Sequence, residues 1–320
     1  MAAVLEIKDL QVGRKNKEGF NAILENVSFS INEGEFVAVV GESGCGKSMT
    51  ALSIMGLLPK TMQVGSGCIL YNGKDITKMS VKEMNKIRGK EISIIFQEPM
   101  TSLNPSFTIG NQLAEVFKYH TDLNAKEIKK RSIEVLNQVK IPDAEEKLKA
   151  YPHELSGGMR QRVMIAMALA CNPKVLIADE PTTALDVTIQ AQILELLYEL
   201  QQNLNMTVIM ITHDLGVVAE ICQKAVVMYA GQVIEEASVE ELFENPKHPY
   251  TKALMLSVPK LGSRKKELYS IEGTVPDFDN MPKGCRFNPR CQAATHECRE
   301  KEPQLMDVGH GRRVRCWHFM

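Results

Sequence analysis

Long apolar runs are missing from this chain of 320 residues. No stretch approaches the ~20 apolar residues that a membrane-spanning helix needs, and the N-terminus lacks the basic-then-apolar pattern of a secretory signal. An excess of charge of one sign is also missing, since 38 Lys and Arg face 39 Asp and Glu. This balance excludes a global field directed at nucleic acid or an anionic bilayer. We expect a cytoplasmic chain that reaches a membrane only through a partner.

Internal repeats and low-complexity tracts are absent from the sequence as well. Basic residues cluster only locally, at 129–131 and 312–315, and such clusters usually lie on a solvated face or tail. Half of the eight cysteines are scattered singly, which is typical of reduced core or loop residues; these are Cys45, Cys68, Cys171 and Cys222.

Short apolar segments predict an α/β fold. Residues 5–10 and 27–31 alternate as antiparallel strands do. Uniformly apolar runs between helical stretches predict a parallel sheet that is covered on both faces; they are residues 36–40, 92–96, 175–179 and 207–212. Residues 225–229 and 232–235 predict a hairpin with Ala230 and Gly231 at its turn. Residues 110–170 are expected to be mostly helical, and the chain after residue 262 to be loop-rich.

The strand expected at 36–40 leads into the most informative motif. Residues 41–48 read G-E-S-G-C-G-K-S, and an apolar helical run, 49–58, follows. A strand, a glycine-rich loop and a helix in this order form a phosphate-cradling P-loop, because backbone N–H groups and the helix N-terminus point at the phosphates. Lys47 can reach the terminal phosphates, and Ser48 can hold Mg²⁺.

The strand expected at 175–179 ends in two acids, Asp179 and Glu180. Beside a P-loop, Asp179 is suited to the magnesium shell and Glu180 to orienting or deprotonating the attacking water. Alone, the pattern would indicate only a strand that ends at a solvated turn. The segment 155–162, L-S-G-G-M-R-Q-R, opens another helix and could form a second anion site or simply a Ser-capped helix start.

Together these motifs, in this order, resemble the ATPases of the ABC transporter family. The resemblance covers roughly residues 4–243 and includes Gln97, residues 184–186 (A-L-D) and residues 212–214 (T-H-D). It implies a head-to-tail dimer with two nucleotides between the P-loop of one subunit and the segment 155–158 of the other. Gln97 is expected to join the metal shell and sense a membrane partner, His213 to grip the terminal phosphate, and Asp186 to link the two sites.

The resemblance sets the candidate site residues. The catalytic candidates are Glu180, His213, Lys47 and Gln97. The nucleotide-binding candidates are Gly41, Glu42, Ser43, Gly44, Cys45, Gly46, Lys47, Ser48, Met49, Arg14, Ser156, Gly157, Gly158 and Asp186. The magnesium candidates are Ser48, Gln97 and Asp179. In the family, an aromatic residue stacks on adenine, and its position falls near Arg14, in a polar segment at 13–19. Phe20 is the only aromatic nearby, but a guanidinium can also stack on a flat ring. The adenine contact therefore stays open between Arg14 and Phe20.

Residues 97–105, 248–254 and 257–259 resemble the oligopeptide/dipeptide/nickel importer branch of the family. We therefore expect the ATP-hydrolysing subunit of a di- or oligopeptide importer. The alternatives are a nickel or other small-solute importer of the same branch, and a soluble non-transport ABC ATPase. Expected partners are a similar, non-identical second ATPase subunit (or a homodimer in isolation), two transmembrane permeases and, indirectly, an extracytoplasmic peptide-binding protein. No nucleic acid is expected, and the chain is placed peripherally at the cytoplasmic face of the membrane.

Four cysteines occur late in the chain, at Cys285, Cys291, Cys298 and Cys316. In a cytosolic chain a disulfide framework is not expected, and the spacing alone leaves zinc, an iron–sulfur cluster and unligated thiols open. The resemblance favours a [4Fe–4S] cluster with a structural role. The expected architecture is thus a P-loop NTPase (RecA-like) core with an antiparallel β subdomain and a helical ABC subdomain, within 1–245, the helical part at about 98–170. A loop-rich iron–sulfur domain at 246–320 is expected to follow, and the expected cofactors are ATP, Mg²⁺ and [4Fe–4S].

Overall fold

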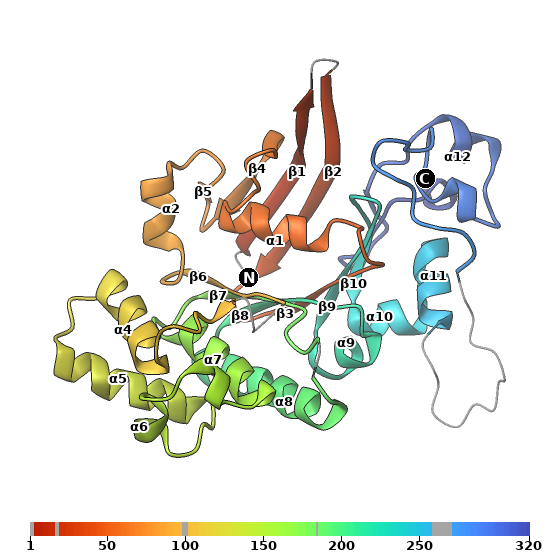
Figure 1. Ribbon diagram of the computed structural model, residues 1–320. Helices are drawn as coiled ribbons and strands as arrows, with labels where there is room; N and C mark the ends of the chain where they lie inside the picture. The colour runs from red at the N-terminus through yellow and green to blue at the C-terminus, as the bar shows by residue number, and fades with distance from the viewer. Residues whose placement is uncertain (1–2, 17–18, 98–101, 184, 258–270) are drawn as a thin grey trace. The chain divides into compact units, whose positions relative to one another are not determined.

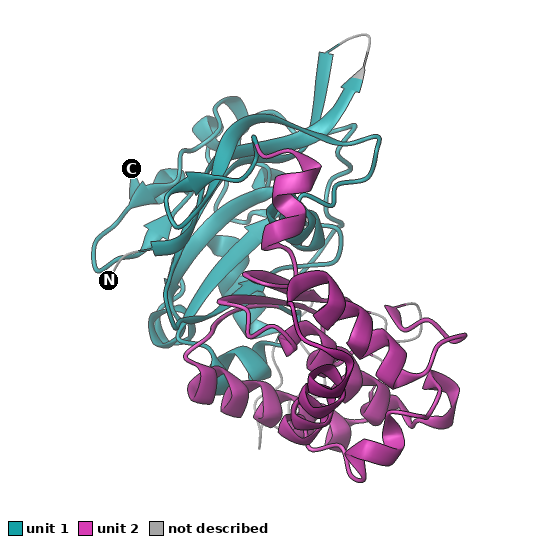
Figure 2. Ribbon diagram, turned by 90° about the vertical axis from the view of Figure 1, so that its left-hand side faces the viewer, with its two compact units in different colours: residues 1–78, 211–320 teal, residues 79–210 magenta. Residues whose placement is uncertain are grey.

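The computed structural model describes residues 3–16, 19–97, 102–183, 185–257 and 271–320. The chain divides into two compact units, one formed by 1–78 with 211–320 and the other by 79–210 (Figure 2). Each unit is described by itself. Parts of the motifs used above, at 98–101, 184 and 258–259, lie outside the described residues.

The first unit begins with an antiparallel sheet of order β2-β1-β4-β5 (Figure 1). Its strands are β1 (Ala3–Asn16), β2 (Gly19–Asn32), β4 (Gln63–Tyr71) and β5 (Lys74–Asp75). Alternate side chains of β1, such as Leu5 and Ile7, are buried, as period-two patterning requires. The two antiparallel strands expected at 5–10 and 27–31 are confirmed, and β1 continues to Asn16 while β2 begins at Gly19, both within the polar segment at 13–19.

The second sheet of this unit contains the strand that precedes the P-loop. Strand β3 (Phe36–Val40) is buried along its whole length and pairs in parallel with β9 (Lys224–Tyr229). Strand β10 (Gln232–Ser238) runs antiparallel to β9. The predicted hairpin is confirmed, and Ala230 and Gly231 at its turn have φ of 44° and 82°. A Cβ on Gly231 would lie 1.9 Å from the Ile23 carbonyl oxygen, so this position requires glycine.

The C-terminal segment extends this same sheet. Strand β12 (Arg313–Val314) pairs with β10, and β11 (Met306–Asp307) pairs with β12. Short helical segments accompany the strands: α10 (Val239–Glu244), α11 (Pro249–Leu256), η2 (Asn288–Arg290), α12 (His296–Glu300) and η3 (Trp317–Phe319).

Buried arginines attach this segment, which corrects the expectation of a solvated basic cluster at 312–315. Arg312 and Arg315 are 4% and 5% exposed. Arg312 pairs with Glu235, Arg313 pairs with Glu236, and Arg315 Nε donates to the Val233 carbonyl at 2.9 Å. Carboxylates of β10 therefore supply counter-charges that no local sequence pattern reveals.

The expected iron–sulfur domain is wrong. Among the residues that the structure describes, no group of three or more His, Cys, Asp or Glu side chains could hold a metal ion. The cluster was expected from the family resemblance. Its structural role was expected because a segment rich in Pro, Gly and charge buries little surface to offset the entropy of ordering. Strand pairing with β10 and the buried arginine pairs stabilise the segment instead. The domain boundary at 245/246 stays a prediction.

The second unit holds strands in the order β8-β7-β6. Strands β6 (Ile92–Ile95) and β7 (Val175–Asp179) pair in parallel, and β8 (Thr207–Ile211) ends at the border between the units. All residues of β7 and β8 are buried. Strands β3, β6 and β7 thus lie in parallel pairs, as predicted, and β8 is likewise buried. Uniformly apolar runs are typical of such strands because both of their faces are covered.

Helices fill the rest of this unit: α2 (Val81–Ile87), α4 (Ile109–His120), α5 (Ala125–Gln138), α6 (Ala144–Lys147), η1 (Pro152–Glu154), α7 (Gly157–Leu169) and α8 (Val187–Leu204). The mostly helical stretch predicted at 110–170 is confirmed. Capping fixes the helix starts, since Asn124 and Glu127 form a reciprocal capping box at α5.

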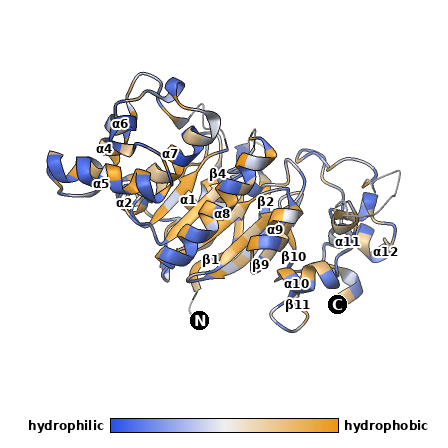
Figure 3. Cartoon of the chain, turned by 90° about the horizontal axis from the view of Figure 1, so that it is seen from below, coloured by the Kyte–Doolittle hydropathy of each residue, from blue (hydrophilic) through white to orange (hydrophobic). Residues whose placement is uncertain are grey.

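Strand residues are mostly orange in Figure 3, and the helices carry blue polar residues along their length. This distribution is expected when strands build the core and helices cover it. Within the described part of the chain, no helix combines the length and apolar character needed to cross a bilayer.

Candidate functional site

The P-loop connects β3 to helix α1 (Lys47–Met55) in the first unit. Gly41 has φ of 152°, and a Cβ there would lie 2.2 Å from the Met228 carbonyl oxygen. Gly46 has φ of 104°, and a Cβ there would lie 2.5 Å from Leu24. Both positions combine a backbone conformation that side chains rarely adopt with a close approach, so the glycines of the motif are sterically required.

Lys47 lies inside this loop and is 6% exposed. Its Nζ donates to the carbonyl oxygens of Gly41 at 2.7 Å and Glu42 at 3.0 Å. The carbonyls of the first two loop residues therefore hold the ammonium, and a lysine at this position of the motif can reach bound phosphates. Ser48 is exposed in the first turn of α1. The loop thus places one cation and one hydroxyl at the start of the same helix.

The other loop candidates divide by exposure. Ser43 and Gly44 are exposed, Met49 is half-buried, and Cys45 is fully buried. Burial raises the pKa of the Cys45 thiol, although the nearby Lys47 opposes the shift. A protonated, enclosed thiol is not nucleophilic, so Cys45 serves the loop by packing and through its backbone.

His213 lies at the same sheet edge as the P-loop. The backbone N–H of Thr212 donates to the Val39 carbonyl at 3.3 Å, next to the end of β3. His213 follows and is exposed. Asp214 caps helix α9 (Leu215–Ile221), accepting from Gly216 N–H at 2.9 Å. This hydrogen bond places Thr212, and His213 directly after it, beside the end of β3. The contact of His213 with the terminal phosphate stays a prediction.

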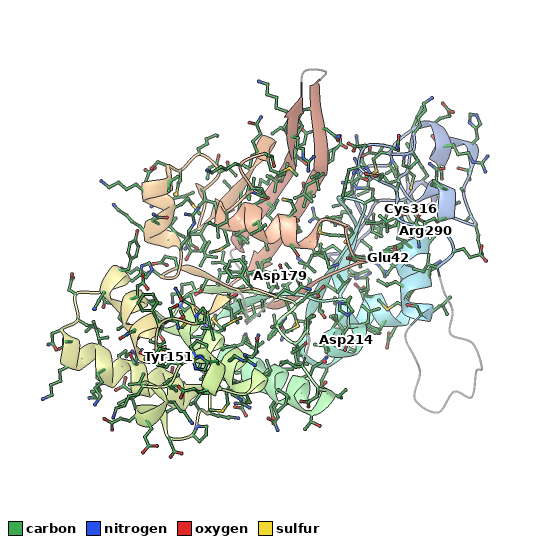
Figure 4. All side chains as sticks on the ribbon, viewed as in Figure 1. Glu42, Tyr151, Asp179, Asp214, Arg290 and Cys316 are labelled. Atoms are coloured by element: carbon green, nitrogen blue, oxygen red, sulfur yellow. The ribbon has the colours of Figure 1, made fainter. Side chains whose placement is uncertain are left out.

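In the second unit, β7 presents Asp179 and Glu180 at its carboxyl end (Asp179 is labelled in Figure 4). Asp179 is 8% exposed. Glu180 has φ of 45°, an uncommon backbone conformation for a residue with a side chain and one that often marks functional sites. Its Oε2 accepts from Gln97 Nε2 at 2.8 Å and from Thr183 Oγ1 at 3.0 Å. The structure therefore brings two predicted residues together and adds Thr183, which sequence reasoning missed.

The glycine-rich segment 155–158 begins helix α7 in the same unit. Ser156 is the N-cap, and its hydroxyl accepts from Met159 N–H at 3.3 Å. Gly157 and Gly158 occupy the first turn, where a Cβ on Gly158 would lie 2.8 Å from Ile189. The first glycine leaves the helix tip open, and the second permits close packing on α8.

Gln161 joins this helix to the turn after β7. Its Nε2 donates to the Pro181 carbonyl at 2.6 Å, and the side chain is 1% exposed. Asp186 caps α8 and accepts from Ile189 N–H at 3.0 Å. Sequence reasoning missed the role of Gln161. The available signal was a polar residue on the buried face of a helix, which requires a specific partner.

The adenine candidates lie on the hairpin of β1 and β2. Arg14 pairs with Asn21, and Phe20 pairs with Lys15. Arg14 is exposed, whereas the ring of Phe20 lies against the backbone of Gly65. Both assignments stay predictions. The P-loop, His213 and this hairpin belong to the first unit, and the remaining candidates belong to the second.

The four late cysteines line one small pocket together with His248 and Trp317. Burial raises the pKa of Cys285 to about 11, and burial likewise raises the pKa of Cys291 and Cys316. Because the described residues contain no group that could hold a metal ion, the predicted [4Fe–4S] ligand set of Cys285, Cys291, Cys298 and Cys316 is wrong.

Comparisons with known families match both parts of the chain. Residues 24–183 match the family model described as "ABC transporter". Residues 234–298 match the family model described as "Oligopeptide/dipeptide transporter, C-terminal region". The second match includes residues 246–298 of the segment 246–320, which was expected to be an iron–sulfur domain.

Curated relatives match over nearly the whole chain. The chain is 51% identical to the oligopeptide transport ATP-binding protein AppD of Bacillus subtilis, over 100% of this chain and 98% of the relative. It is 49% identical to the dipeptide transport ATP-binding protein DppD of Escherichia coli, over 98% and 96%. It is 48% identical to the oligopeptide transport ATP-binding protein OppD of Haemophilus influenzae, over 99% and 98%.

Solved structures match the ATPase core. A dimeric, post-hydrolysis state of the ATP-binding cassette MJ0796 with ADP and Pi has a TM-score of 0.65 and 31% identity, covering 73% of this chain and 98% of that one. The cbiO1 protein from Clostridium perfringens has a TM-score of 0.66 and 32% identity, covering 77% and 92%.

Proposed function

Because the chain belongs to the ABC transporter ATPases, in the group of oligopeptide and dipeptide transport ATP-binding proteins, we propose that it hydrolyses ATP to drive peptide import through partner membrane subunits. ATP hydrolysis is the activity of the family. The relatives are named oligopeptide or dipeptide transport proteins, so peptides are the transported solute that their names give. Those names favour peptide over nickel. The observation that carries the proposal is a P-loop in which Gly41 and Gly46 are sterically required and Lys47 is hydrogen-bonded to the loop backbone.

Lys47 and the first turn of α1 bind the phosphates of ATP in this proposal. Phosphoryl transfer depends mainly on positioning and on stabilising negative charge, which a buried ammonium beside loop N–H groups provides. Ser48, Gln97 and Asp179 would hold Mg²⁺, since hydroxyl, amide and carboxylate oxygens are its preferred ligands. Bound Mg²⁺ neutralises charge on the phosphate oxygens.

Glu180 orients and deprotonates the attacking water. The amide of Gln97 and the hydroxyl of Thr183 both donate to Glu180 Oε2, so the carboxylate is fixed by two partners. A general base is most effective when its position is fixed before the reaction. His213 is proposed to contact the terminal phosphate.

A second ATPase subunit completes each nucleotide site. The open tip of α7, with Ser156 exposed and Gly157 and Gly158 lacking side chains, would contact phosphates that the opposite P-loop holds. Dimeric ATP-binding cassettes among the solved neighbours support this arrangement. We propose a similar, non-identical partner chain, two membrane permeases, and peripheral association at the cytoplasmic face of the membrane.

The Glu180→Gln substitution tests the proposal. It preserves size and hydrogen bonding to Gln97 but removes the base, so ATP should still bind while turnover falls by roughly 10²–10⁴-fold. The ATP-bound variant should accumulate as a dimer in size-exclusion chromatography. Glu195→Gln, an exposed acid on α8, is the matched control and should keep wild-type turnover.

Two results would count against the proposal in different ways. Wild-type turnover by Glu180→Gln would show that another group is the base. Failure of the wild-type chain to hydrolyse ATP, alone and with its membrane partners, would overturn the ATPase function itself.

A further inference from the structure

The P-loop residue Glu42 is bonded through all of its polar groups. Its carboxylate accepts two hydrogen bonds from Arg290, Nη1 to Oε2 at 2.7 Å and Nη2 to Oε1 at 3.0 Å. Its backbone N–H donates to Tyr250 Oη at 2.9 Å. Its carbonyl accepts from Lys47 Nζ at 3.0 Å. Glu42 thus connects the phosphate-binding lysine to two residues more than two hundred positions later (Figure 4 labels Glu42 and Arg290).

Arg290 is itself held rigidly. Its side chain is 4% exposed, and Nε donates to the Glu272 carbonyl at 2.9 Å. The guanidinium lies 5.7 Å from the centre of the Tyr229 ring and 6.0 Å from that of Phe287. Hydrogen bonding to Glu42 raises the pKa of Arg290 above its ordinary value. A two-pronged contact from a fixed guanidinium gives Glu42 a defined orientation as well as a counter-charge.

Tyr250 is equally constrained. It is fully buried, and its ring packs against Tyr229 at 4.8 Å and Phe287 at 5.5 Å between centres. Its hydroxyl therefore cannot follow Glu42 if the loop moves. Residues of the C-terminal region thus bind the side chain and the backbone N–H of Glu42. The carbonyl of the same residue accepts a hydrogen bond from Lys47.

We propose that Arg290 is a positioning residue for ATP binding, which neutralises Glu42 and fixes the loop segment that Lys47 contacts. This inference rests on the proposed ATPase function. ATP carries several negative charges into the loop, and an unpaired carboxylate at its second residue would repel them. Arg290 removes that repulsion without touching the nucleotide. The C-terminal region thereby controls affinity for ATP.

The test measures the dissociation constant of the purified full chain for ATP with Mg²⁺, by calorimetry, and the KM and kcat for hydrolysis. Arg290→Gln should weaken ATP binding about tenfold, the size expected when charged hydrogen bonds are lost. The KM should rise in parallel, while kcat changes by less than about threefold, because Arg290 does not contact the reacting atoms. Arg290→Lys keeps the positive charge but cannot make two parallel hydrogen bonds to Glu42, so its dissociation constant for ATP should lie between those of the wild type and Arg290→Gln.

The double variant separates electrostatic positioning from simple folding. Adding Glu42→Gln to Arg290→Gln removes the unpaired carboxylate, so about threefold of the lost affinity should return, whereas the part that depends on fixing the loop should stay lost. A merely structural defect would not recover. Arg299→Gln, at an exposed arginine of α12, is the matched control. Emission from Trp317, the chain's single tryptophan, reports whether the C-terminal region stays folded.

Each outcome decides the inference. Weakened binding in the single variant with recovery in the double variant supports it. Wild-type affinity of Arg290→Gln, or a double variant no better than the single one, overturns it and leaves the ATPase function standing. A wild-type chain that binds no ATP overturns both.

Discussion

Removal of the Arg312 guanidinium should destabilise the attachment of the C-terminal strands. Arg312 is 4% exposed, and its partner Glu235 is fully buried on β10. Nε donates to Glu235 Oε1 at 3.1 Å, Nη2 bonds the same oxygen, and Nη2 also donates to the Asn245 carbonyl at 2.7 Å. Arg312→Met would keep much of the volume and leave the carboxylate without its cation.

The size of the effect follows from burial. Breaking a buried ion pair by removing one partner costs about 3–5 kcal/mol. Glu235 keeps two backbone donors, Lys247 N–H at 2.9 Å and His248 N–H at 2.8 Å. We therefore expect Arg312→Met to lower the free energy of unfolding by about 3 kcal/mol, at the lower end of that range. Adding Glu235→Gln should recover part of the loss, since a neutral amide still accepts one of those hydrogen bonds.

Urea unfolding followed by Trp317 emission measures this prediction, because Trp317 lies in the C-terminal region and its indole donates to the Lys301 carbonyl. The exposed Arg299→Met is the control and should stay within about 0.5 kcal/mol of wild type. A loss below about 1 kcal/mol for Arg312→Met, with an unchanged denaturant slope, would refute the reasoning. It would mean that the backbone donors alone satisfy the buried carboxylate.

Two further predictions concern His248 and the segment after Gln97. Burial, aided by Arg315, lowers the pKa of His248 to about 3. Since the unfolded histidine binds the proton more tightly, stability should fall as pH drops from about 6.5 towards 3, by up to about 1.4 kcal/mol per pH unit. His248→Asn should remove that slope in acid unfolding curves, and an unchanged slope would contradict the assignment. We propose that the segment 97–109, which begins at Gln97, meets a permease, and Ser102 is an exposed residue of this segment. Ser102→Cys should crosslink to a membrane subunit in a nucleotide-dependent way, and a crosslink that ignores nucleotide would count against that docking.

Local chemistry explains why much of the site was predictable. The P-loop requires glycine wherever its backbone has positive φ or meets another chain segment, as at Gly41 and Gly46. Uniformly apolar runs indicate buried parallel strands, and acids directly after such a run lie at the sheet edge, as Asp179 and Glu180 do. These features depend on residues that are close together in the sequence, so a sequence pattern predicts them.

Long-range partners explain what was missed. The buried pairs of Arg312 and Arg313 with β10 join residues 77 positions apart, and Arg290 reaches Glu42 across 248 positions. In sequence, Arg312 and Arg313 look like part of a solvated basic cluster, and Arg290 carries no signal at all. The expected iron–sulfur domain rested on the family resemblance and on the composition of the segment itself. Neither reveals that a strand and carboxylates of β10 stabilise this segment.

The sequence by itself determined the phosphate-binding loop, the buried strands, the helical stretch and the family, because each depends on periodicity or on residues close together in the chain. Only the tertiary structure decided which charges are buried, how the C-terminal region is attached, and that this region bonds the P-loop through Glu42. The physical reason is that the energy of a buried charge depends on its partner, and local sequence does not specify a partner hundreds of residues away.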